Sequence, residues 1–352
     1  MATCYYNETM LFFYNLNGNK SGSEDNIFEK TYYVGLGFGI LCCLFIFLCN
    51  AMIIIAVARN RRFHFPFYYL LANLAAADIF ASLAYVFLMF HTGHVSRTLT
   101  VHQYFLREAL LNVSFCASLY SLLVIAVERY FSVMKMRLHS NLSERRVTCL
   151  VLAIWGTAIF MAAIPNMGWN CICNISTCSS LAPIYSRSFL IFWALFNLCT
   201  FFIIVMMYLR IYIYVRKKTL NLMSHTTGSI KRGKMPMKLI KTIVTVLGAF
   251  IFCWTPGLIV VLLDGIRCTS CNVLTVKIWV LLLALTNSLM NPIIYSYKDP
   301  EMWHVIKQML FLGCGDKVEM DQVTLKSTSN RHSVVSEHTD LGADRHQLQS
   351  GP

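Results

Sequence analysis

Four cationic side chains stand at the edges of long apolar stretches, where fixed charges are rare. They are Lys30, Arg107, Arg187 and Lys277. A phosphomonoester carries a charge of about −1.5 to −2, and fixed cations with forked donors bind it well. Arg107 precedes Arg129 by 22 residues, so it stands about 33 Å away along one helix. The set predicts a phosphate clamp at one mouth of a helix bundle. The alternative is that each side chain lies along apolar surface and only keeps its charged end in water.

Apolar side chains in the same stretches suit the other end of an amphiphilic ligand. Trp193 and Trp254, together with Leu111 and Phe115, offer surface for an acyl chain, although ordinary helix packing explains each one alone. Glu108 follows the arginine of the clamp directly. Its carboxylate either pairs with a cation of the ligand or is neutralised by a cation of the protein, which leaves two ligand classes open.

A second polar set lies deep inside apolar segments. It consists of Asp78, Ser118, Asn287, Ser288 and Asn291. Polar and ionisable groups in such surroundings are costly and are therefore candidates for function. The set predicts a hydrated pocket for a small cation such as sodium, and the alternative is a hydrogen-bonded network without an ion. We expect no other metal and no organic cofactor.

A charge pair and two prolines predict a bundle with two conformations. Glu128-Arg129-Tyr130 lies at the end of a long apolar stretch. The two charged residues either form an ion pair with each other, or separate to contact a partner protein, or only extend their charged ends to the membrane–water interface. Pro256 and Pro292 interrupt two further apolar stretches and kink the helices there. Kinked helices and a breakable ion pair are typical of a switch.

The elements that must position these residues are membrane-spanning helices. Of the 352 residues, 57% are hydrophobic and only 13% are charged, about half the charge of an average soluble domain. This composition excludes a soluble enzyme, a disordered chain and a small disulfide-stapled secreted protein. Seven stretches are long enough to cross a bilayer. They are residues 34–58, 67–90, 104–127, 147–165, 188–214, 239–263 and 278–297.

Basic residues are divided unequally between the two sets of loops. One set, which includes residues 59–62, 135–146 and 216–241, holds most of them, and the opposite set holds few. Because positive loops stay in the cytosol, we expect the N-terminus outside and the C-terminus inside a multi-pass plasma-membrane protein. The net charge of +13 therefore follows largely from topology and indicates no nucleic-acid partner.

We predict an all-α membrane protein with four segments. Residues 1–33 form an extracellular cap, 34–297 the seven-helix bundle, 298–314 a helix on the membrane surface, and 315–352 a disordered cytoplasmic tail. Glycosylation sequons on the outer side begin at Asn7, Asn19 and Asn174. Cys314 is a candidate for palmitoylation, and serines and threonines within 327–336 are candidates for phosphorylation that recruits arrestin.

Six cysteines fall on the predicted outer side, where an oxidising environment favours disulfides. They are Cys4, Cys171, Cys173, Cys178, Cys268 and Cys271. Six cysteines allow 15 pairings, and the spacing does not choose among them. Only the last two, three residues apart, favour a small loop-closing disulfide, because a second zinc half-site of matching spacing is missing.

Two other classes of heptahelical membrane protein fit the sequence poorly. A light-driven retinal pump needs a lysine in the middle of its last helix, and residues 278–297 contain none. An intramembrane protease needs paired aspartates or a serine and histidine in facing helices, and Asp78 stands alone. We therefore expect a receptor and no enzyme.

Motifs on five different spans resemble the rhodopsin-like G-protein-coupled receptors. The matching residues are Asn50, Asp78, Glu128-Arg129-Tyr130, Cys253-Trp254-Thr255-Pro256 and Asn291-Pro292-Ile293-Ile294-Tyr295. The resemblance implies that Arg129 lies where a heterotrimeric G protein inserts and that Trp254 is a toggle beneath the ligand. Residues 101–111 contain no cysteine, so the disulfide that this family commonly makes from its third span is excluded.

The same region is similar to the lysophospholipid receptors, and especially to their lysophosphatidic acid branch. The matching segments are residues 62–66, 70–78, 87–90, 168–171, 179–187 and 262–264. The resemblance implies a lysophosphatidic acid ligand and coupling to inhibitory and phospholipase C-activating G proteins. It also implies the disulfides Cys171–Cys178, Cys4–Cys173 and Cys268–Cys271.

Glu108 departs from that branch. Lysophosphatidic acid receptors have glutamine at this position, whereas sphingosine 1-phosphate receptors have glutamate. A carboxylate pairs with the ammonium of a sphingoid base, and an amide hydrogen-bonds a ligand without a cation. This residue alone therefore favours a sphingosine 1-phosphate receptor, the alternative to lysophosphatidic acid.

Overall fold

The computed structural model describes residues 4–16, 25–134, 143–225, 234–268, 271, 273–298 and 300–311. Asn19, Cys314, the tail from residue 315 and the side chains of Lys30 and Tyr295 lie outside the described part, so the predictions there stay predictions. The helices within it are α1 (Met10–Leu16), α2 (Asp25–Arg59), η1 (Arg61–Phe63), α3 (Pro66–Phe90), α4 (His94–Thr98), α5 (Val101–Met134), α6 (Glu144–Ala163), η2 (Ile175–Thr177), α7 (Arg187–His225), α8 (Lys234–Gly265), α9 (Val273–Lys298) and α10 (Pro300–Phe311).

Seven of these helices are long and apolar enough to cross a bilayer, which confirms the all-α, seven-span prediction. They are α2, α3 and α5 to α9. Several extend beyond the predicted spans: α2 already begins at Asp25, and α7 continues to His225. The reason is that hydropathy marks only the lipid-immersed part, whereas backbone hydrogen bonds continue along a helix into water.

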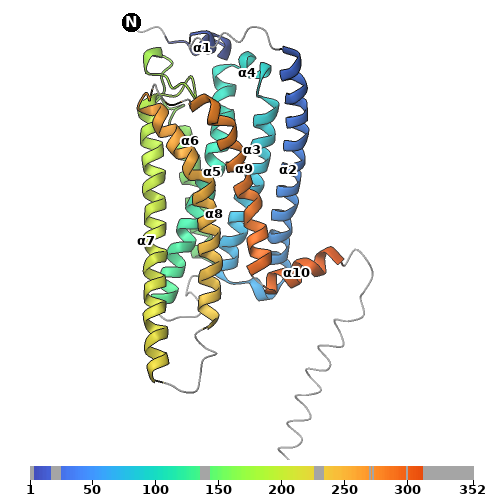
Figure 1. The fold of residues 1–352 in the computed structure, drawn as a ribbon, viewed down its shortest axis with the longest axis vertical. Coiled ribbons are helices and arrows are strands. Elements are labelled where there is room, and N and C mark those ends of the chain that lie inside the picture. Colours follow the sequence, from blue (N-terminus) through green and yellow to red (C-terminus); the bar gives the residue numbers. More distant parts are fainter. Residues whose placement is uncertain are drawn as a thin grey trace, which may run out of the picture. The chain divides into compact units, whose positions relative to one another are not determined.

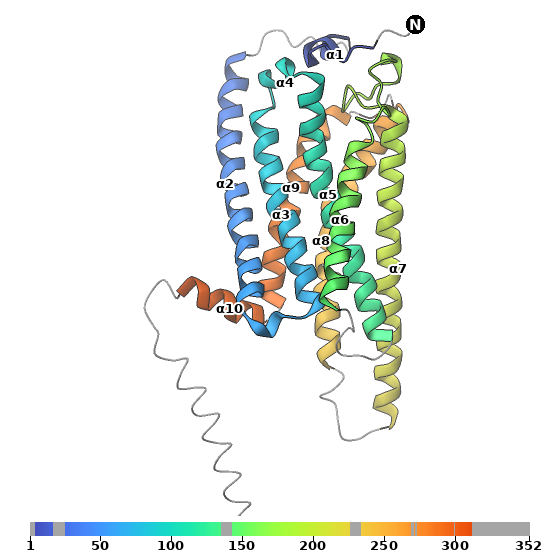
Figure 2. The same ribbon diagram turned by 180° about the vertical axis from the view of Figure 1, so that it is seen from behind.

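Residues 1–303 form one compact unit in which six spanning helices close a ring. Around the ring, α2 contacts α3, α3 contacts α5, α5 contacts α7, α7 contacts α8, α8 contacts α9, and α9 returns to α2. The remaining span, α6, packs against α3 and α5 (Figures 1 and 2). Residues 304–352 belong to a second unit, and α10, which reaches into it, is the short helix predicted after the seventh span.

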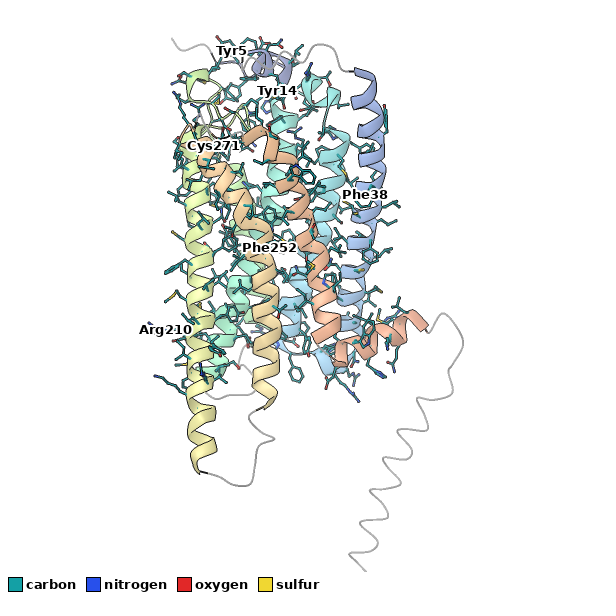
Figure 3. All side chains as sticks on the ribbon, viewed as in Figure 1. Tyr5, Tyr14, Phe38, Arg210, Phe252 and Cys271 are labelled. Atoms are coloured by element: carbon teal, nitrogen blue, oxygen red, sulfur yellow. A yellow bond between two sulfur atoms is a disulfide. The ribbon has the colours of Figure 1, made fainter. Side chains whose placement is uncertain are left out.

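The outer faces of the spanning helices carry large apolar side chains. Phe38 on α2, at the outer edge of the bundle in Figure 3, is 66% exposed, and Phe252 on α8 is 70% exposed. Exposed apolar surface of this extent is stable against lipid, whereas water would make it costly.

A buried amide joins three helices inside the bundle. Asn73 of α3 donates a hydrogen bond from Nδ2 to Ser121 Oγ of α5 at 2.8 Å. Its Oδ1 accepts a hydrogen bond from Trp155 Nε1 of α6 at 3.0 Å. Because both polar groups of the amide are satisfied away from water, the contact fixes how these helices pack.

A cap of short elements covers the end of the bundle at which α5, α7 and α9 begin (Figures 1 and 2). It consists of α1, α4 and the loop 164–186. Met10 and Phe13 of α1 are buried in one cluster with Tyr104 and Phe105 of α5. Gly93 takes a positive φ of 68°, which a glycine adopts without strain, and this turns the chain from α3 into α4. The cap therefore rests directly on the third span of the bundle.

Candidate functional site

A cavity of about 280 Å³ opens beneath the cap. Its polar lining comes from four helices and the turn before α4, and the clamp predicted from the sequence contributes two of the residues, Arg107 and Lys277. These polar residues are Tyr14 of α1, Thr92 of the turn before α4, Ser96 and Arg97 of α4, Arg107 and Glu108 of α5, and Lys277 of α9. Figure 3 shows Tyr14 at the capped end of the bundle.

Arg107 is the most connected side chain of this cavity and is only 4% exposed. One terminal nitrogen donates to the His91 carbonyl at 2.8 Å and to Ser96 Oγ at 3.1 Å. Nε and the other terminal nitrogen donate to Glu108 Oε1 at 3.2 and 2.7 Å. The guanidinium also lies over the Tyr104 ring, 4.3 Å from its centre. These contacts hold the arginine in one orientation, with its charge at the cavity wall.

The ion pair between Glu108 and the neighbouring arginine answers one question that the sequence left open. The carboxylate pairs with a cation of the protein itself, Arg107, at 2.7 Å. Lys277 instead donates from Nζ to the Leu181 carbonyl at 2.9 Å, which connects α9 to the loop. The cavity contains Arg97, Arg107 and Lys277 against one carboxylate. Its formal charge is therefore 3 − 1 = +2.

Aromatic side chains lie next to the apolar wall of the cavity. Leu111 lines the cavity and packs in one cluster with Trp254. The Phe115 ring lies 4.4 Å from that of Trp254 and 5.2 Å from that of Trp193. Trp193 donates from Nε1 to Asn112 Oδ1 at 2.9 Å, so its ring is fixed against α5. The predicted apolar surface thus forms one connected group of side chains.

The structure does not bring all four predicted cations together. Arg187 lines a different cavity, with Arg267 and Asp264. In place of Arg187, the first cavity receives Arg97 and Ser96 from α4. Sequence reasoning missed both, because a five-residue helix gives no hydropathy signal that would place it over the bundle.

The loop residue Tyr185 adds to the packing beneath the cap. Its ring lies 5.5 Å from that of Phe105 and 5.8 Å from that of Phe189. Burial raises the pKa of Tyr185 well above its usual value, and the charge of Glu108 raises it further. The phenol therefore stays neutral and acts through its apolar ring.

The second predicted set forms a buried polar cluster. Asn291 of α9 donates from Nδ2 to Asp78 Oδ2 of α3 at 2.7 Å, and Asn50 of α2 donates to the Ser288 carbonyl at 3.2 Å. Ser118 is also buried, but no hydrogen bond joins it to the others within the described residues. Several oxygens have no hydrogen-bond partner in the described part of the chain. They are Oδ1 of Asn50, Asp78, Asn287 and Asn291. A small hard cation fits this donor set, since such ions take oxygen ligands.

At the opposite end of α5, Glu128 and Arg129 form an ion pair through Oε2 and Nε. The guanidinium of Arg129 lies 4.3 Å from the centre of the Phe67 ring, and Glu128 is buried. Tyr130 is half-buried beside them. The charge pair is thus bonded internally, the first of the arrangements that the sequence allowed.

The two prolines of the predicted switch lie inside continuous helices. Pro256 falls within α8, two residues after Trp254, and Pro292 falls within α9, directly after Asn291. A proline in a helix interior removes one backbone hydrogen bond and weakens the helix locally. Both weak points lie next to residues of the candidate sites.

Disulfides fix the cap and the loops beside it. The pairs are Cys4–Cys173, Cys171–Cys178 and Cys268–Cys271, the same three that the family resemblance implied. The first crosses 169 residues of sequence and joins the segment before α1 to the loop 164–186. The sequon asparagines Asn7 and Asn174 are exposed in this region.

Comparisons with known proteins agree with the motifs. Residues 49–295 match the family described as 7 transmembrane receptor (rhodopsin family). The chain is 55% identical to lysophosphatidic acid receptor 3 of Mus musculus over 100% of its own length and 98% of that relative. It is 60% identical to lysophosphatidic acid receptor 3 of Homo sapiens, over 88% of the chain and 87% of the relative. Lysophosphatidic acid receptor 1 of Homo sapiens is 50% identical, over 87% and 83%.

Proposed function

The chain belongs to the rhodopsin family of seven-transmembrane receptors, and we propose that it is a cell-surface receptor for lysophosphatidic acid. This family is a class of receptors and not of enzymes. The names of the relatives support the ligand, and the cavity beneath the cap supplies the physical reason.

The observation that carries the proposal is the charge of this cavity. Its formal +2 matches the charge of about −1.5 to −2 on a phosphomonoester. Arg107 holds a fixed positive charge at the cavity wall, and Lys277 adds a second cation from α9. Lys30 completes the predicted clamp from the start of the first span. Arg187 belongs to the predicted set too, but it lines the other cavity.

Glu108 is compatible with a ligand that carries no cation. Its Oε1 accepts two hydrogen bonds from Arg107, so its charge is already compensated inside the protein. A sphingoid ammonium would have to compete with this ion pair. The carboxylate therefore does not require a sphingosine 1-phosphate ligand.

The acyl chain extends from the cavity toward Trp254. Contact with this ring acts on α8 next to Pro256, the weak point of the helix, and shifts the bundle toward a second conformation. A heterotrimeric G protein binds at the Arg129 end, where opening of the Glu128 ion pair exposes the guanidinium. Coupling includes the inhibitory and phospholipase C-activating classes, and the phosphorylated tail recruits arrestin. Tyr130 and Tyr295 complete the switch.

The proposed topology has the N-terminus outside the plasma membrane and the C-terminus in the cytoplasm. The basic residues 216–218 at the far end of α7 support it, since positive charge is retained in the cytosol. Asn7, Asn19 and Asn174 are then glycosylated and Cys314 palmitoylated. Sodium binds the cluster around Asp78.

Activation of a G protein by the purified receptor tests the proposal. We expect lysophosphatidic acid to stimulate guanine-nucleotide exchange on a reconstituted inhibitory G protein, and sphingosine 1-phosphate to be at least tenfold weaker. Glu108→Gln should keep the response to lysophosphatidic acid, and Glu8→Gln, an exposed residue with the same charge, is the matched control. Activation by sphingosine 1-phosphate alone would refute the proposed ligand.

A further inference from the structure

A second cavity, of about 440 Å³, lies at the same end of the bundle as the first. Its walls come from the loop 164–186, the beginning of α7, the end of α8, the segment between α8 and α9, and the beginning of α9. It shares no lining residue with the first cavity, so the two are separate. Cys271, one of its lining residues, lies beside the ends of α7 and α8 in Figure 3.

Two guanidinium groups and one carboxylate line this second cavity. Arg187 and Arg267 supply the positive charges and Asp264 the negative one, so the formal charge is 2 − 1 = +1. Asp264 is committed to the loop, because Ser179 Oγ donates to its Oδ2 and the Ser180 N–H donates to its Oδ1 at 3.1 Å. It forms no ion pair with either arginine within the described residues. The positive charges therefore remain available to a ligand.

One of the arginines, Arg187, has a buried donor atom. Nε of Arg187 is inaccessible to solvent and has no hydrogen-bond partner in the described part of the chain. A buried donor without a hydrogen bond destabilises the fold, and the free-energy cost is larger when the donor belongs to a charged group. Arg187 is also the first residue of the long helix α7, where the helix dipole adds positive potential. The helix dipole and the charge of the guanidinium both favour an anion in the cavity.

The other arginine is held in place from a strained backbone position. Arg267 has a φ of 57°, which glycine usually provides at the end of a helix. Its side chain donates to the Ser176 carbonyl at 2.6 Å, so the guanidinium is fixed at the cavity wall. The fold thus accepts a cationic side chain at a position where glycine would be less strained.

We propose that this second cavity binds a phosphate group, independently of the ligand beneath the cap. Arg187 and Arg267 donate to the phosphate oxygens, and the anion connects the beginning of α7 with the segment that follows α8. Leu274 also lines the cavity and is 47% exposed, so an apolar chain attached to the phosphate has a surface to follow. The phosphate comes either from solution or from the headgroup of a lipid in the surrounding leaflet.

Phosphorus-31 NMR of the full chain in maltoside micelles free of phospholipid tests this proposal. The protein carries Arg107→Ala, which weakens phosphate binding in the first cavity. One arm titrates inorganic phosphate, and the other titrates short-chain dihexanoyl phosphatidic acid. Arg187→Gln/Arg267→Gln removes both donors from the second cavity, and Arg145→Gln/Arg210→Gln, two exposed arginines, removes the same charge elsewhere.

We expect the protein to broaden the phosphorus-31 signal of at least one probe. Arg187→Gln/Arg267→Gln should lower the affinity for that probe at least tenfold, whereas the control pair should keep the affinity within twofold. Broadening by both probes identifies phosphate itself as the ligand, and broadening by the lipid alone identifies a headgroup. No broadening by either probe, or equal broadening in Arg187→Gln/Arg267→Gln, would overturn the proposal. Arg187→Lys, which keeps the charge, tests the site if the double variant does not fold. We expect it to weaken binding at least threefold, and unchanged binding would overturn the proposal.

Discussion

Replacing Arg107 with alanine removes the central contact of the cavity beneath the cap. The variant loses the hydrogen bonds to the His91 carbonyl, to Ser96 and to Glu108. It also lowers the formal charge of the cavity from +2 to +1 and leaves the Glu108 carboxylate without its cation. Both changes disfavour a ligand phosphate.

The expected loss of affinity follows from the charge pair that the Arg107 guanidinium forms with the ligand phosphate. Truncating one partner of a buried, hydrogen-bonded charge pair costs about 2–5 kcal/mol. At 1.4 kcal/mol for each factor of ten, Arg107→Ala should weaken lysophosphatidic acid binding by about 30-fold to a few thousand-fold. The double variant Arg107→Ala/Glu108→Gln has the wild-type charge of +2 but lacks the forked donor. We expect it to regain about tenfold over the single variant, since coupled residues share about 0.5–3 kcal/mol.

Competition binding with radiolabelled lysophosphatidic acid measures these differences on the purified receptor. The thermal midpoint of each variant shows that it is folded, and Arg210→Ala, an exposed arginine on α7, is the matched control. An affinity of Arg107→Ala within threefold of wild type would refute the clamp. Full recovery in the double variant would show that only net charge matters and would refute the role of the forked donor.

Three further predictions concern the frame around this cavity. Cys4→Ser/Cys173→Ser opens a disulfide across 169 residues and should lower stability by about 2–4 kcal/mol, measured as a lower thermal midpoint; an unchanged midpoint would contradict this. Glu128→Gln weakens the ion pair with the adjacent arginine and should raise nucleotide exchange without ligand at least twofold, whereas lower basal exchange would argue against a restraining pair. Asn73→Ala removes one buried and one partly buried hydrogen bond between helices and should lower the free energy of unfolding by about 1–3 kcal/mol. A thermal midpoint equal to that of wild type would exclude this role.

Much of the fold follows from hydropathy and charge alone. The seven spans are visible because lipid requires about 20 apolar residues in each helix. The full lengths of the helices are not visible, since helical hydrogen bonds such as those of α7 continue past the apolar part to His225. The disulfide pairs came from the family resemblance, because spacing alone leaves 15 arrangements of six cysteines.

The candidate site was predictable only in part. Arg107, Glu108 and Lys277 are charged residues at the mouth of apolar spans, and such positions stand out in a sequence. Their partners do not stand out: the His91 carbonyl carries no residue-specific signal, and Ser96 lies on a short polar helix. Arg187 is equally visible in the sequence, but the path of the loop 164–186 decides which cavity it joins.

The central claim is that the cavity beneath the cap recognises the phosphate of a lysophospholipid. The most direct test compares the affinity of the purified receptor for lysophosphatidic acid with that for the monoacylglycerol that has the same acyl chain and no phosphate. We predict that removal of the phosphate weakens binding at least a hundredfold in wild type and less than tenfold in Arg107→Ala. Equal affinity of wild type for the two lipids would contradict the claim.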